Sequence, residues 1–326
     1  MSKDQAILGS LNAGALKGVR PEKAQAALGQ VPRLLDELSA LERELERATQ
    51  DAEATLRAAA RHLVGAGGKR IRPMVALLSC GACGGQMAAA VPLAAAAELT
   101  HSATLLHDDV IDDGPVRRGQ PASRVIWGNT VSVLAGDWLL TRALEMVNAH
   151  PARGPALPAL LGTMRRLVEG EVKQLSLRGG FHATEQDYFQ VIDGKTASLF
   201  GWATAAGAWA AGADGEAPEA LSRFGEGIGM AFQLVDDALD YAADPQQLGK
   251  RLGADLAEGK ATLPLIRALA AEPRLRERLV PIADGIEPPE RAAAEVVEAV
   301  RRSGGVEAAR ALAREHTGRA MAALQR

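Results

Sequence analysis

Two segments of the chain carry the pattern DDxxD, each at the end of an apolar stretch: HSATLLHDDVIDD and FQLVDDALDY. The six aspartates are Asp108, Asp109, Asp112, Asp236, Asp237 and Asp240. Residues four apart share a helix face, so the first and last aspartate of each motif lie side by side, where like charges destabilise the helix. One such motif is typical of a solvated helix end, but two copies favour a cation-dependent function. Mg²⁺ suits them, because it takes one or two carboxylates and completes its octahedron with water and substrate phosphate. The two motifs therefore predict a diphosphate held through Mg²⁺.

Basic residues stand beside glycines or just past the two aspartate motifs. GGKRIRP carries Lys69, Arg70 and Arg72, Arg117 and Arg118 follow the first motif, DGKTAS carries Lys195, and GKRLGADLAEGKAT carries Lys250 and Lys260. Taken singly, each is typical of a solvated surface charge. Their positions together favour phosphate binding, with Arg suited to bidentate contact and Lys acting as a point charge.

Ala- and Leu-rich stretches with helical spacing must position these side chains. The leucines from Leu34 onward predict one helix that runs to about Val64, and Pro73 marks the first turn of a second. Further helices are predicted at about 92–113, 129–149, 157–177, 184–212, 217–243, 259–271 and from 288 to the end. Thr184 and Asp187 predict a capping box. Because the period-2 runs of strands are missing and no repeat or low-complexity linker divides the chain, we expect an all-α protein with a single domain over residues 1–326.

Composition narrows the function further. The chain has 326 residues, a formal net charge of −3 and no Lys/Arg-rich block with interleaved aromatics, so nucleic acid is not the expected partner. The N-terminus lacks the pattern of a signal peptide, and no apolar run approaches the roughly 20 residues of a membrane span. We therefore expect a cytoplasmic protein. Cys80 and Cys83 form a lone CGAC, for which two free thiols are the favoured interpretation over a redox or zinc site.

Taken together, the motifs resemble those of the trans-isoprenyl diphosphate synthase family, the head-to-tail prenyltransferases. The resemblance covers residues of about 30–270 and runs in order through GGKRIRP, ELTHSATLLHDDVIDDGPVRRGQPA, GNTVSVLAGDWLL, EGEVKQLS, DGKTASLF, FQLVDDALDY and GKRLGADLAEGKATLPL. It implies antiparallel helices around a central cavity (the isoprenoid synthase fold), a homodimer, and two substrates, isopentenyl diphosphate and an allylic diphosphate such as farnesyl or geranyl diphosphate.

The resemblance also implies a role for each motif residue. Asp108 and Asp112 would bind two Mg²⁺ ions on the allylic diphosphate and Asp236 a third, with Asp109, Asp237 and Asp240 in support. Arg117, Lys195 and Lys250 would clamp the allylic diphosphate, with Lys260 and Gln233 nearby. Lys69, Arg72, His101 and Arg118 would hold isopentenyl diphosphate. Thr196 and Gln233 would face, as neutral dipoles, the cation that forms when the allylic carbon–oxygen bond ionises.

Chain length is predicted from the helix that ends at the first motif. If the growing tail lies along this helix, Ala103 and Thr104, one turn before Asp108, line its path. Family members with short C15 or C20 products carry a bulky side chain in this region, so these two small residues favour a long product, C35 to C50, with octaprenyl (C40) the best single prediction. Trp138, Leu139 or Met146 would form the floor. Such a product is a lipid, so a peripheral membrane contact for its release is also expected.

Three other functions stay open at this point. A short-chain farnesyl or geranylgeranyl diphosphate synthase would share every motif. A non-catalytic regulatory subunit usually loses acidic residues from its motifs, whereas both are whole here. A terpene cyclase usually walls its cation with aromatic rings, which make up only 3% of this chain.

Overall fold

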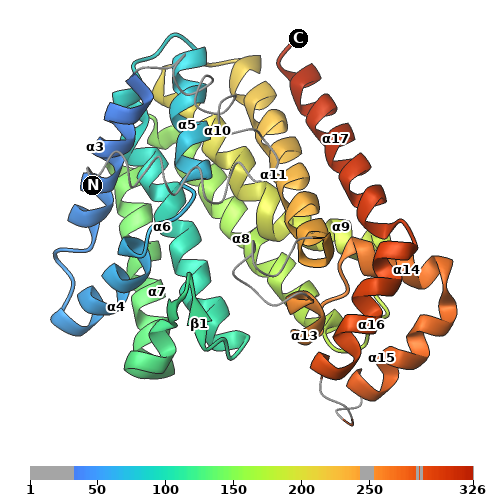
Figure 1. The fold of residues 1–326 in the computed structure, drawn as a ribbon. Helices are drawn as coiled ribbons and strands as arrows, with labels where there is room; N and C mark the ends of the chain where they lie inside the picture. The colour runs from blue at the N-terminus through green and yellow to red at the C-terminus, as the bar shows by residue number, and fades with distance from the viewer. Residues whose placement is uncertain (1–32, 243–252, 284–285, 287–288, 326) are drawn as a thin grey trace. The chain divides into compact units, whose positions relative to one another are not determined.

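The computed structural model describes residues 33–242, 253–283, 286 and 289–325, and these are helical almost throughout (Figure 1). The strands in these ranges are β1 (Val116–Arg117) and β2 (Gln120–Pro121), which pair antiparallel. The residues group into two compact units, one containing residues up to 160 together with 202–222, the other 161–201 together with those from 223 onward. The predicted all-α class is confirmed, and the single domain stays a prediction.

The first unit is built around one buried helix. Its helices are α3 (Arg33–Ala48), α4 (Ala54–Gly65), α5 (Ile71–Ala82), α6 (Met87–Ile111) and α7 (Ser123–Ala149), with the start of α8 (Arg153–Leu177) and parts of α10 (Ser198–Ala210) and α11 (Glu216–Ala242). Helix α6 packs against α3, α5 and α7. Four consecutive alanines, 94–97, are fully buried on it, as expected of a helix enclosed on every side. The first aspartate motif thus ends the most enclosed helix of this unit.

The predicted single helix from Leu34 to about Val64 is wrong, because the structure divides it into α3 and α4. The side chain of Glu53 accepts hydrogen bonds from the backbone N–H groups of Thr55 (2.8 Å) and Leu56 (3.4 Å). These bonds satisfy donors that the first turn of a helix leaves unpaired. A new helix therefore begins at Ala54 although the apolar spacing continues across the break.

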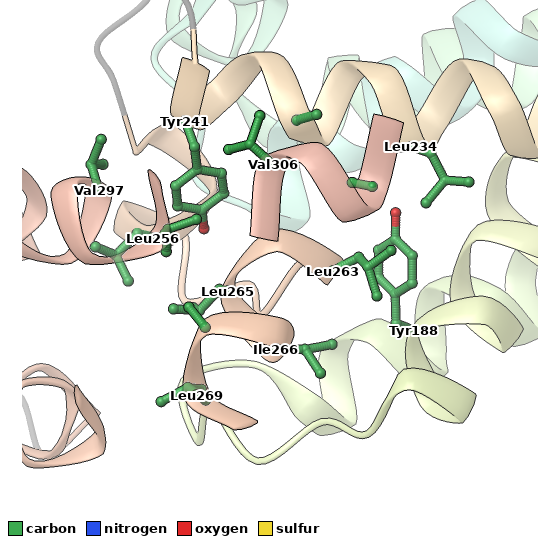
Figure 2. Packing of buried hydrophobic residues seen from close by; sticks show 14 of the residues in the cluster. Tyr188, Leu234, Tyr241, Leu256, Leu263, Leu265, Ile266, Leu269, Val297 and Val306 are labelled. Carbon is green, nitrogen blue, oxygen red and sulfur yellow. The ribbon is translucent and has the colours of Figure 1, made fainter. Parts of the chain in front are cut away.

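The second unit surrounds an apolar cluster. Its further elements are α9 (Glu185–Ile192), η2 (Asp193–Ala197), α13 (Ala254–Ala257), α14 (Leu263–Ala271), η3 (Pro273–Leu275), α15 (Arg276–Ala283), α16 (Pro289–Arg302) and α17 (Gly305–Ala323). Figure 2 shows Tyr188, Leu234, Tyr241, Leu256 and Leu263 converging in this cluster. Each comes from a different turn or element, so the cluster joins α9, α11, α13 and α14 around the second aspartate motif.

A π-helical turn interrupts the predicted helix at 184–212. Residues 193–197 form η2, in which the N–H of Ser198 donates to the carbonyl of Asp193, five residues back. The predicted capping box opens α9, since Thr184 accepts from the N–H of Asp187 and the Asp187 carboxylate accepts from the N–H of Thr184. Short π-helical turns inside helices are rare and are found mostly at functional sites.

The remaining sequence expectations hold in outline. The predicted helices at 92–113, 129–149, 157–177 and 217–243 correspond to α6, α7, α8 and α11, and the helical stretch from 288 is divided into α16 and α17 at Gly304 (φ 76°). The thiols of Cys80 and Cys83 are free. None of the helices that the structure describes combines the length and hydropathy needed to cross a bilayer.

Candidate active site

The first aspartate motif occupies the C-terminal turn of α6. Asp108 and Asp109 lie within the helix, and Asp112 is its C-cap residue. Asp109 is 1% exposed, whereas Asp108 and Asp112 are half-buried. The carbonyl groups at a helix C-terminus already carry partial negative charge, which the carboxylates increase. This end of α6 is therefore a strongly electronegative surface suited to cations.

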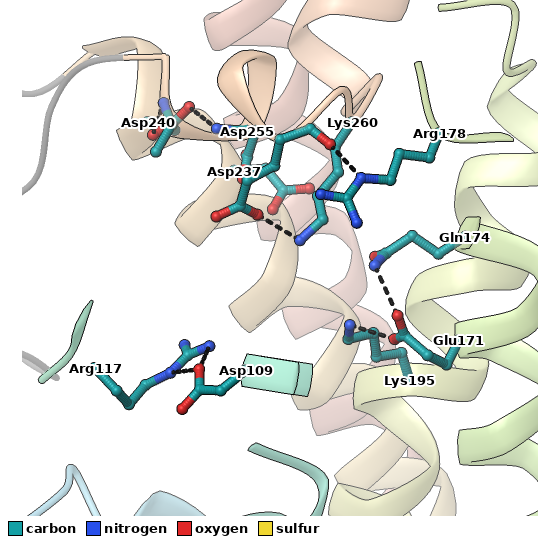
Figure 3. A network of polar contacts seen from close by, with 12 residues as sticks. Asp109, Arg117, Glu171, Gln174, Arg178, Lys195, Asp237, Asp240, Asp255 and Lys260 are labelled. Atoms are coloured by element: carbon teal, nitrogen blue, oxygen red, sulfur yellow. Dashed lines mark hydrogen bonds and ion pairs between the residues drawn. The ribbon is translucent and has the colours of Figure 1, made fainter. Parts of the chain in front are cut away.

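Asp109 is tied to the hairpin that follows α6. The Nε of Arg117 donates to Asp109 Oδ1 at 2.8 Å, and its Nη2 lies 2.6 Å from the same oxygen (Figure 3). Asp109 Oδ2 is buried and accepts no hydrogen bond from the described residues. Arg117, predicted to clamp an allylic diphosphate, thus contacts the aspartate motif directly, and the supporting role of Asp109 stays a prediction.

Arg118 stands at the tip of the same hairpin and points to another loop. Arg118 (φ 54°) and Gly119 (φ 76°) both adopt positive φ, as the central residues of a type I′ hairpin turn do. The Arg118 guanidinium donates to the carbonyl of Leu63 at 3.1 Å and to the carbonyl of Gly67. The hairpin therefore joins the loop that carries GGKRIRP to the first aspartate motif.

The buried side chain of Arg70 joins that loop to the neighbouring helices. It is 4% exposed, with φ 47°, and it precedes the first residue of α5. Its guanidinium donates to Glu98 of α6 at 2.6 Å, to Glu42 of α3 at 2.7 Å and to the carbonyl of Val64 at 2.8 Å. Burial opposes the charge on Arg70, but the carboxylates of Glu98 and Glu42 outweigh burial and raise its pKa. These contacts join Arg70, a left-handed residue between α4 and α5, to α3 and α6.

The other predicted isopentenyl diphosphate residues lie on this framework. Lys69 is next to Arg70 in the loop, Arg72 lies in the first turn of α5, and His101 lies on α6. Burial lowers the pKa of Arg72 to about 10. Burial, and then the charges of Arg72 and Arg118, lower the pKa of His101 well below its ordinary value. Cationic side chains therefore surround His101, and its role with Arg72 in binding isopentenyl diphosphate stays a prediction.

The residues predicted to control product length sit one turn earlier on α6. Ala103 is fully buried, whereas Thr104 is half-buried and its hydroxyl donates to the carbonyl of His101 at 2.8 Å. On α7, Leu139 is fully buried and Trp138 and Met146 are half-buried. The Trp138 Nε1 is buried and has no hydrogen-bond partner among the described residues. No described cavity is lined by these residues, so their roles stay predictions.

The second aspartate motif divides into one outward and two inward carboxylates. Asp236 is exposed, Asp237 is 5% exposed and Asp240 is half-buried. Asp240 accepts from the N–H groups of Ala254 (3.2 Å) and Asp255 (3.1 Å), and so caps the start of α13. Burial, together with the charges of Asp236 and Asp240, raises the pKa of Asp237 to about 7, although Tyr188 and Gln233 donate to it. Asp236 is thus the most exposed carboxylate of the motif, and its role as a metal ligand stays a prediction.

A cavity of about 150 Å³ lies within the second unit. It is lined by residues of α8, α9, η2, α11 and the segment after α13: Gln174, Leu177, Arg178, Ala183, Tyr188, Val191, Ile192, Lys195, Thr196, Gln233, Asp237, Asp255, Gly259, Lys260, Ala261 and Thr262. Four predicted site residues, Lys195, Thr196, Gln233 and Lys260, are therefore brought together in one cavity beside Asp237. Figure 3 shows Lys195, Lys260 and Arg178 as the cationic groups of this region.

The turn that carries Lys195 and Thr196 is held at close quarters by α8. A Cβ on Gly170 would lie 2.8 Å from the backbone nitrogen of Lys195, and one on Gly194 would lie 2.7 Å from the carbonyl oxygen of Arg166. Glycine at both positions permits this approach. Arg166 also donates to both carboxylate oxygens of Asp193, at 3.0 and 2.9 Å, and Lys195 pairs with Glu171 (Figure 3). Helix α8 thus fixes η2 by backbone contact and by two ion pairs.

Of the two lysines predicted to bind phosphate after the second motif, the structure describes Lys260 but not Lys250. Lys260 lines the cavity and its Nζ lies 2.5 Å from Glu258 Oε2. Beside it, Asp255 is half-buried, and desolvation followed by the charge of Asp237 raises the pKa of its carboxyl well above the ordinary value. The prediction for Lys250 lies outside the described residues.

The donor chemistry of the motifs fits a divalent metal ion. Asp108, Asp112 and Asp236 present hard carboxylate oxygens that are not fully buried. In the part of the chain that the structure describes, no three His, Cys, Asp or Glu side chains converge as a ready metal site. Mg²⁺ does not need one, because it usually binds one or two carboxylates and takes its other ligands from water and substrate phosphate.

Sequence reasoning missed several residues of this region. Glu98 carried a detectable signal, since it is a lone charge within the apolar stretch 87–100 of α6. Glu171 stands in EGEVKQLS, but nothing in that motif identifies Lys195 as its partner. Tyr188, which donates to Asp237, and Asp255, which lies beside Lys260, have no spacing that relates them to the second aspartate motif.

The chain is similar to proteins of one family over most of its length. The family model described as polyprenyl synthetase matches residues 53–300. The chain is 40% identical over 271 residues to an octaprenyl diphosphate synthase of Escherichia coli, covering 81% of each chain. It is 41% identical over 266 residues to a short chain isoprenyl diphosphate synthase of Methanothermobacter thermautotrophicus, covering 80% of this chain and 81% of that one.

A solved structure agrees with both comparisons. The polyprenyl synthase of Caulobacter crescentus, complexed with calcium and isoprenyl diphosphate, superposes with a TM-score of 0.83 at 39% identity, covering 90% of this chain and 91% of that one. The helical fold, both aspartate motifs and the cationic residues around them therefore have a common explanation. The chain belongs to the polyprenyl synthetase family and is a prenyltransferase of the trans-polyprenyl diphosphate synthase type.

Proposed function

We propose that this prenyltransferase makes a long-chain product of C35 to C50, with octaprenyl diphosphate the best single assignment. The observation that carries the proposal is the small size of Ala103 and Thr104, one turn before the first aspartate motif. An aromatic ring on this stretch of α6 would obstruct a tail that extends along the helix. Overall identity does not discriminate, because the octaprenyl and short-chain relatives are 40% and 41% identical to this chain.

The substrates are an allylic primer, farnesyl or geranyl diphosphate, and isopentenyl diphosphate. Arg117, Lys195, Lys250 and Lys260 are proposed to bind the allylic diphosphate, and Lys69, Arg72, His101 and Arg118 the isopentenyl diphosphate. The allylic carbon–oxygen bond breaks and both electrons leave with the diphosphate. The C3–C4 double bond of isopentenyl diphosphate then attacks the allylic cation, and a proton is lost to the released diphosphate. The cationic side chains stabilise charge where it develops, which is usually the largest single contribution to catalysis.

Asp108, Asp112 and Asp236 are the proposed ligands of Mg²⁺, about three ions per site by resemblance to the family. The ions supply neutralisation of the departing diphosphate when bound. Asp109 and Asp240 support the ligands through their contacts with Arg117 and with the start of α13. Asp237 is placed by Tyr188 and Gln233, so it too acts in support.

One assay separates this proposal from the alternatives. The purified chain is incubated with farnesyl diphosphate, isopentenyl diphosphate and Mg²⁺, and the dephosphorylated products are separated by reverse-phase chromatography. We expect a ladder ending between C35 and C50. Products that stop at C15 or C20 would identify a short-chain synthase, turnover without isopentenyl diphosphate a cyclase, and absence of any product a regulatory subunit.

We further propose a homodimer, for which α7 supplies the supporting observation. Val133 and Leu134 are neighbours on this helix and are 38% and 50% exposed, and Ile126, which precedes the non-helical Gly128 (φ 81°), is 47% exposed. A second copy of the chain is the proposed cover for these apolar side chains. Sedimentation equilibrium should give twice the mass of one chain, and the mass of a single chain at micromolar concentration would contradict the proposal.

For location, we propose the cytoplasm, with a peripheral membrane contact when the lipid product is released. The test is flotation of the protein with phospholipid vesicles, before and after turnover. Binding that increases once long products form is expected, and equal recovery in the unbound fraction in both cases would contradict the membrane contact.

A further inference from the structure

Four side chains of the second unit form a continuous hydrogen-bonded chain along the cavity wall. Thr196 Oγ1 donates to Gln233 Oε1 at 2.9 Å, and Gln233 Nε2 donates to Asp237 Oδ1 at 2.7 Å. At the other end, Tyr188 Oη donates to Asp237 Oδ2 at 2.6 Å. All four residues line the cavity that also contains Lys195 and Lys260.

The direction of this chain follows from what each group can donate. Both oxygens of Asp237 accept, Oδ2 from the Tyr188 hydroxyl and Oδ1 from the Gln233 amide. The NH₂ group of Gln233 must therefore face Asp237, which turns its carbonyl oxygen toward Thr196. The hydroxyl of Thr196 then has to donate its single proton to that oxygen.

This direction decides what Thr196 presents to the cavity. With its proton committed to Gln233, the hydroxyl oxygen has only lone pairs left for a ligand. If the Gln233 amide were turned over, its NH₂ group would donate to Thr196, and the hydroxyl proton would be free to point into the cavity. The observed direction offers the negative end of a dipole, which stabilises a nearby cation, and the reversed one offers the positive end.

Tyr188 is the residue that makes the observed direction the favoured one. Its ring is 5% exposed, and its helix α9 begins at the capping box formed by Thr184 and Asp187. By donating to Oδ2, the hydroxyl orients the Asp237 carboxylate so that Oδ1 faces Gln233. Without that donor, a buried carboxylate oxygen would be left without a partner, and the carboxylate would be driven to rotate toward other donors.

We propose that Tyr188 is a positioning residue of the prenyl transfer reaction, which acts through Asp237 and Gln233 to hold the Thr196 hydroxyl as an acceptor toward the cavity. The inference deepens the proposed function, because it relies on a cation forming beside Thr196. It gives Tyr188 no contact with the reacting atoms. Its effect should therefore be seen in the rate of ionisation and not in the binding of either diphosphate.

The test is a double-mutant cycle with Tyr188→Phe and Thr196→Val, measured on a single condensation of farnesyl with isopentenyl diphosphate. Tyr188→Phe should lower kcat by about 10-fold to 100-fold, the range expected for loss of one hydrogen bond to a charged group. KM for each substrate should change by less than about twofold. In the Thr196→Val background the same substitution should lower kcat by less than about twofold, because the hydroxyl it orients is gone.

Two further measurements separate positioning from damage to the fold. The dissociation constant of a non-ionisable allylic thiodiphosphate, measured by calorimetry, should be the same for Tyr188→Phe and the parent. The matched control is Tyr241→Phe, which removes the hydroxyl of the other tyrosine, which is also buried but lies outside the chain of four. It should retain the parental kcat.

Each outcome bears on the inference separately from the proposed function. Effects of Tyr188→Phe and Thr196→Val that multiply, or a Tyr188→Phe enzyme with parental kcat, would overturn the positioning role. Weakened thiodiphosphate binding with unchanged kcat would do so as well, because Tyr188 would then serve binding. A parent enzyme that makes only short products would overturn the long-chain proposal, while the cycle on a single condensation would still decide the role of Tyr188.

Discussion

The Asp236→Ala enzyme is expected to lose roughly 10³-fold in kcat while folding as the parent does. Asp236 is the exposed carboxylate of the second motif, so its removal leaves no buried group without a partner, and the free energy of unfolding should change by less than about 0.5 kcal/mol. The activity, in contrast, depends on neutralising a diphosphate that leaves with both bonding electrons. Steady-state kinetics with saturating Mg²⁺ and thermal unfolding of the same preparation measure the two effects.

A matched control distinguishes this effect from a general loss of negative charge. Asp214→Ala removes another exposed aspartate, from the loop between α10 and α11, and should leave kcat unchanged. If Asp236→Ala kept more than about a tenth of parental kcat at low Mg²⁺, the assignment of Asp236 as a metal ligand would be wrong.

An aromatic ring at position 104 is expected to shorten the product from the C35–C50 range to C15–C20. Thr104 is half-buried on α6, so Thr104→Phe can be accommodated with little strain, and its ring would occupy the path proposed for the growing tail. Ala103→Phe should shorten the product too. Because Ala103 is fully buried, however, the larger side chain must displace its neighbours and is expected to destabilise the protein by about 1–3 kcal/mol. Reverse-phase analysis of dephosphorylated products gives the length distribution of each enzyme.

Leu105→Phe is the control for these two variants. It adds a ring to the same turn of α6, but about 100° further around the helix axis. The product of Leu105→Phe should be as long as that of the parent. Parental product length in both Thr104→Phe and Ala103→Phe would show that the tail does not follow this face of α6.

The parts of the fold that depend on local spacing could be predicted, and those that depend on side-chain contacts could not. The apolar periodicity identified α6, α7, α8 and α11, and the pair Thr184 and Asp187 identified the start of α9. The break between α3 and α4 was missed, because it depends on the Glu53 side chain reaching forward to the backbone N–H groups of Thr55 and Leu56. The π-helical turn η2 was missed as well, and it packs closely against Gly170 of α8, a contact that no local spacing predicts.

In the candidate site, too, the sequence predicted which residue types matter but not which residues contact one another. The motifs identified which carboxylates and cations matter, and the family resemblance separated the expected metal ligands Asp108, Asp112 and Asp236 from their supporting neighbours, but neither gave the partner of any of them. Burial separates them, since Asp109 and Asp237 face inward and Asp236 faces solvent. The buried pair of Arg70 with Glu98 joins residues 28 positions apart in sequence, and the bond from Tyr188 to Asp237 spans 49 positions. No spacing rule connects residues at such separations.

The extra residue in the turn of η2 changes the angular phase between the side chains of α9 and those of η2 itself. An α-helix turns about 100° per residue, so Tyr188, Ile192 and Thr196, at intervals of four, would drift around the axis by about 40° at each step. The wider turn at 193–197 rotates less per residue and cancels part of this drift. All three side chains therefore line the same cavity over two turns. In a regular α-helix with the same residues, Thr196 would point away from the cavity surface that Tyr188 lines.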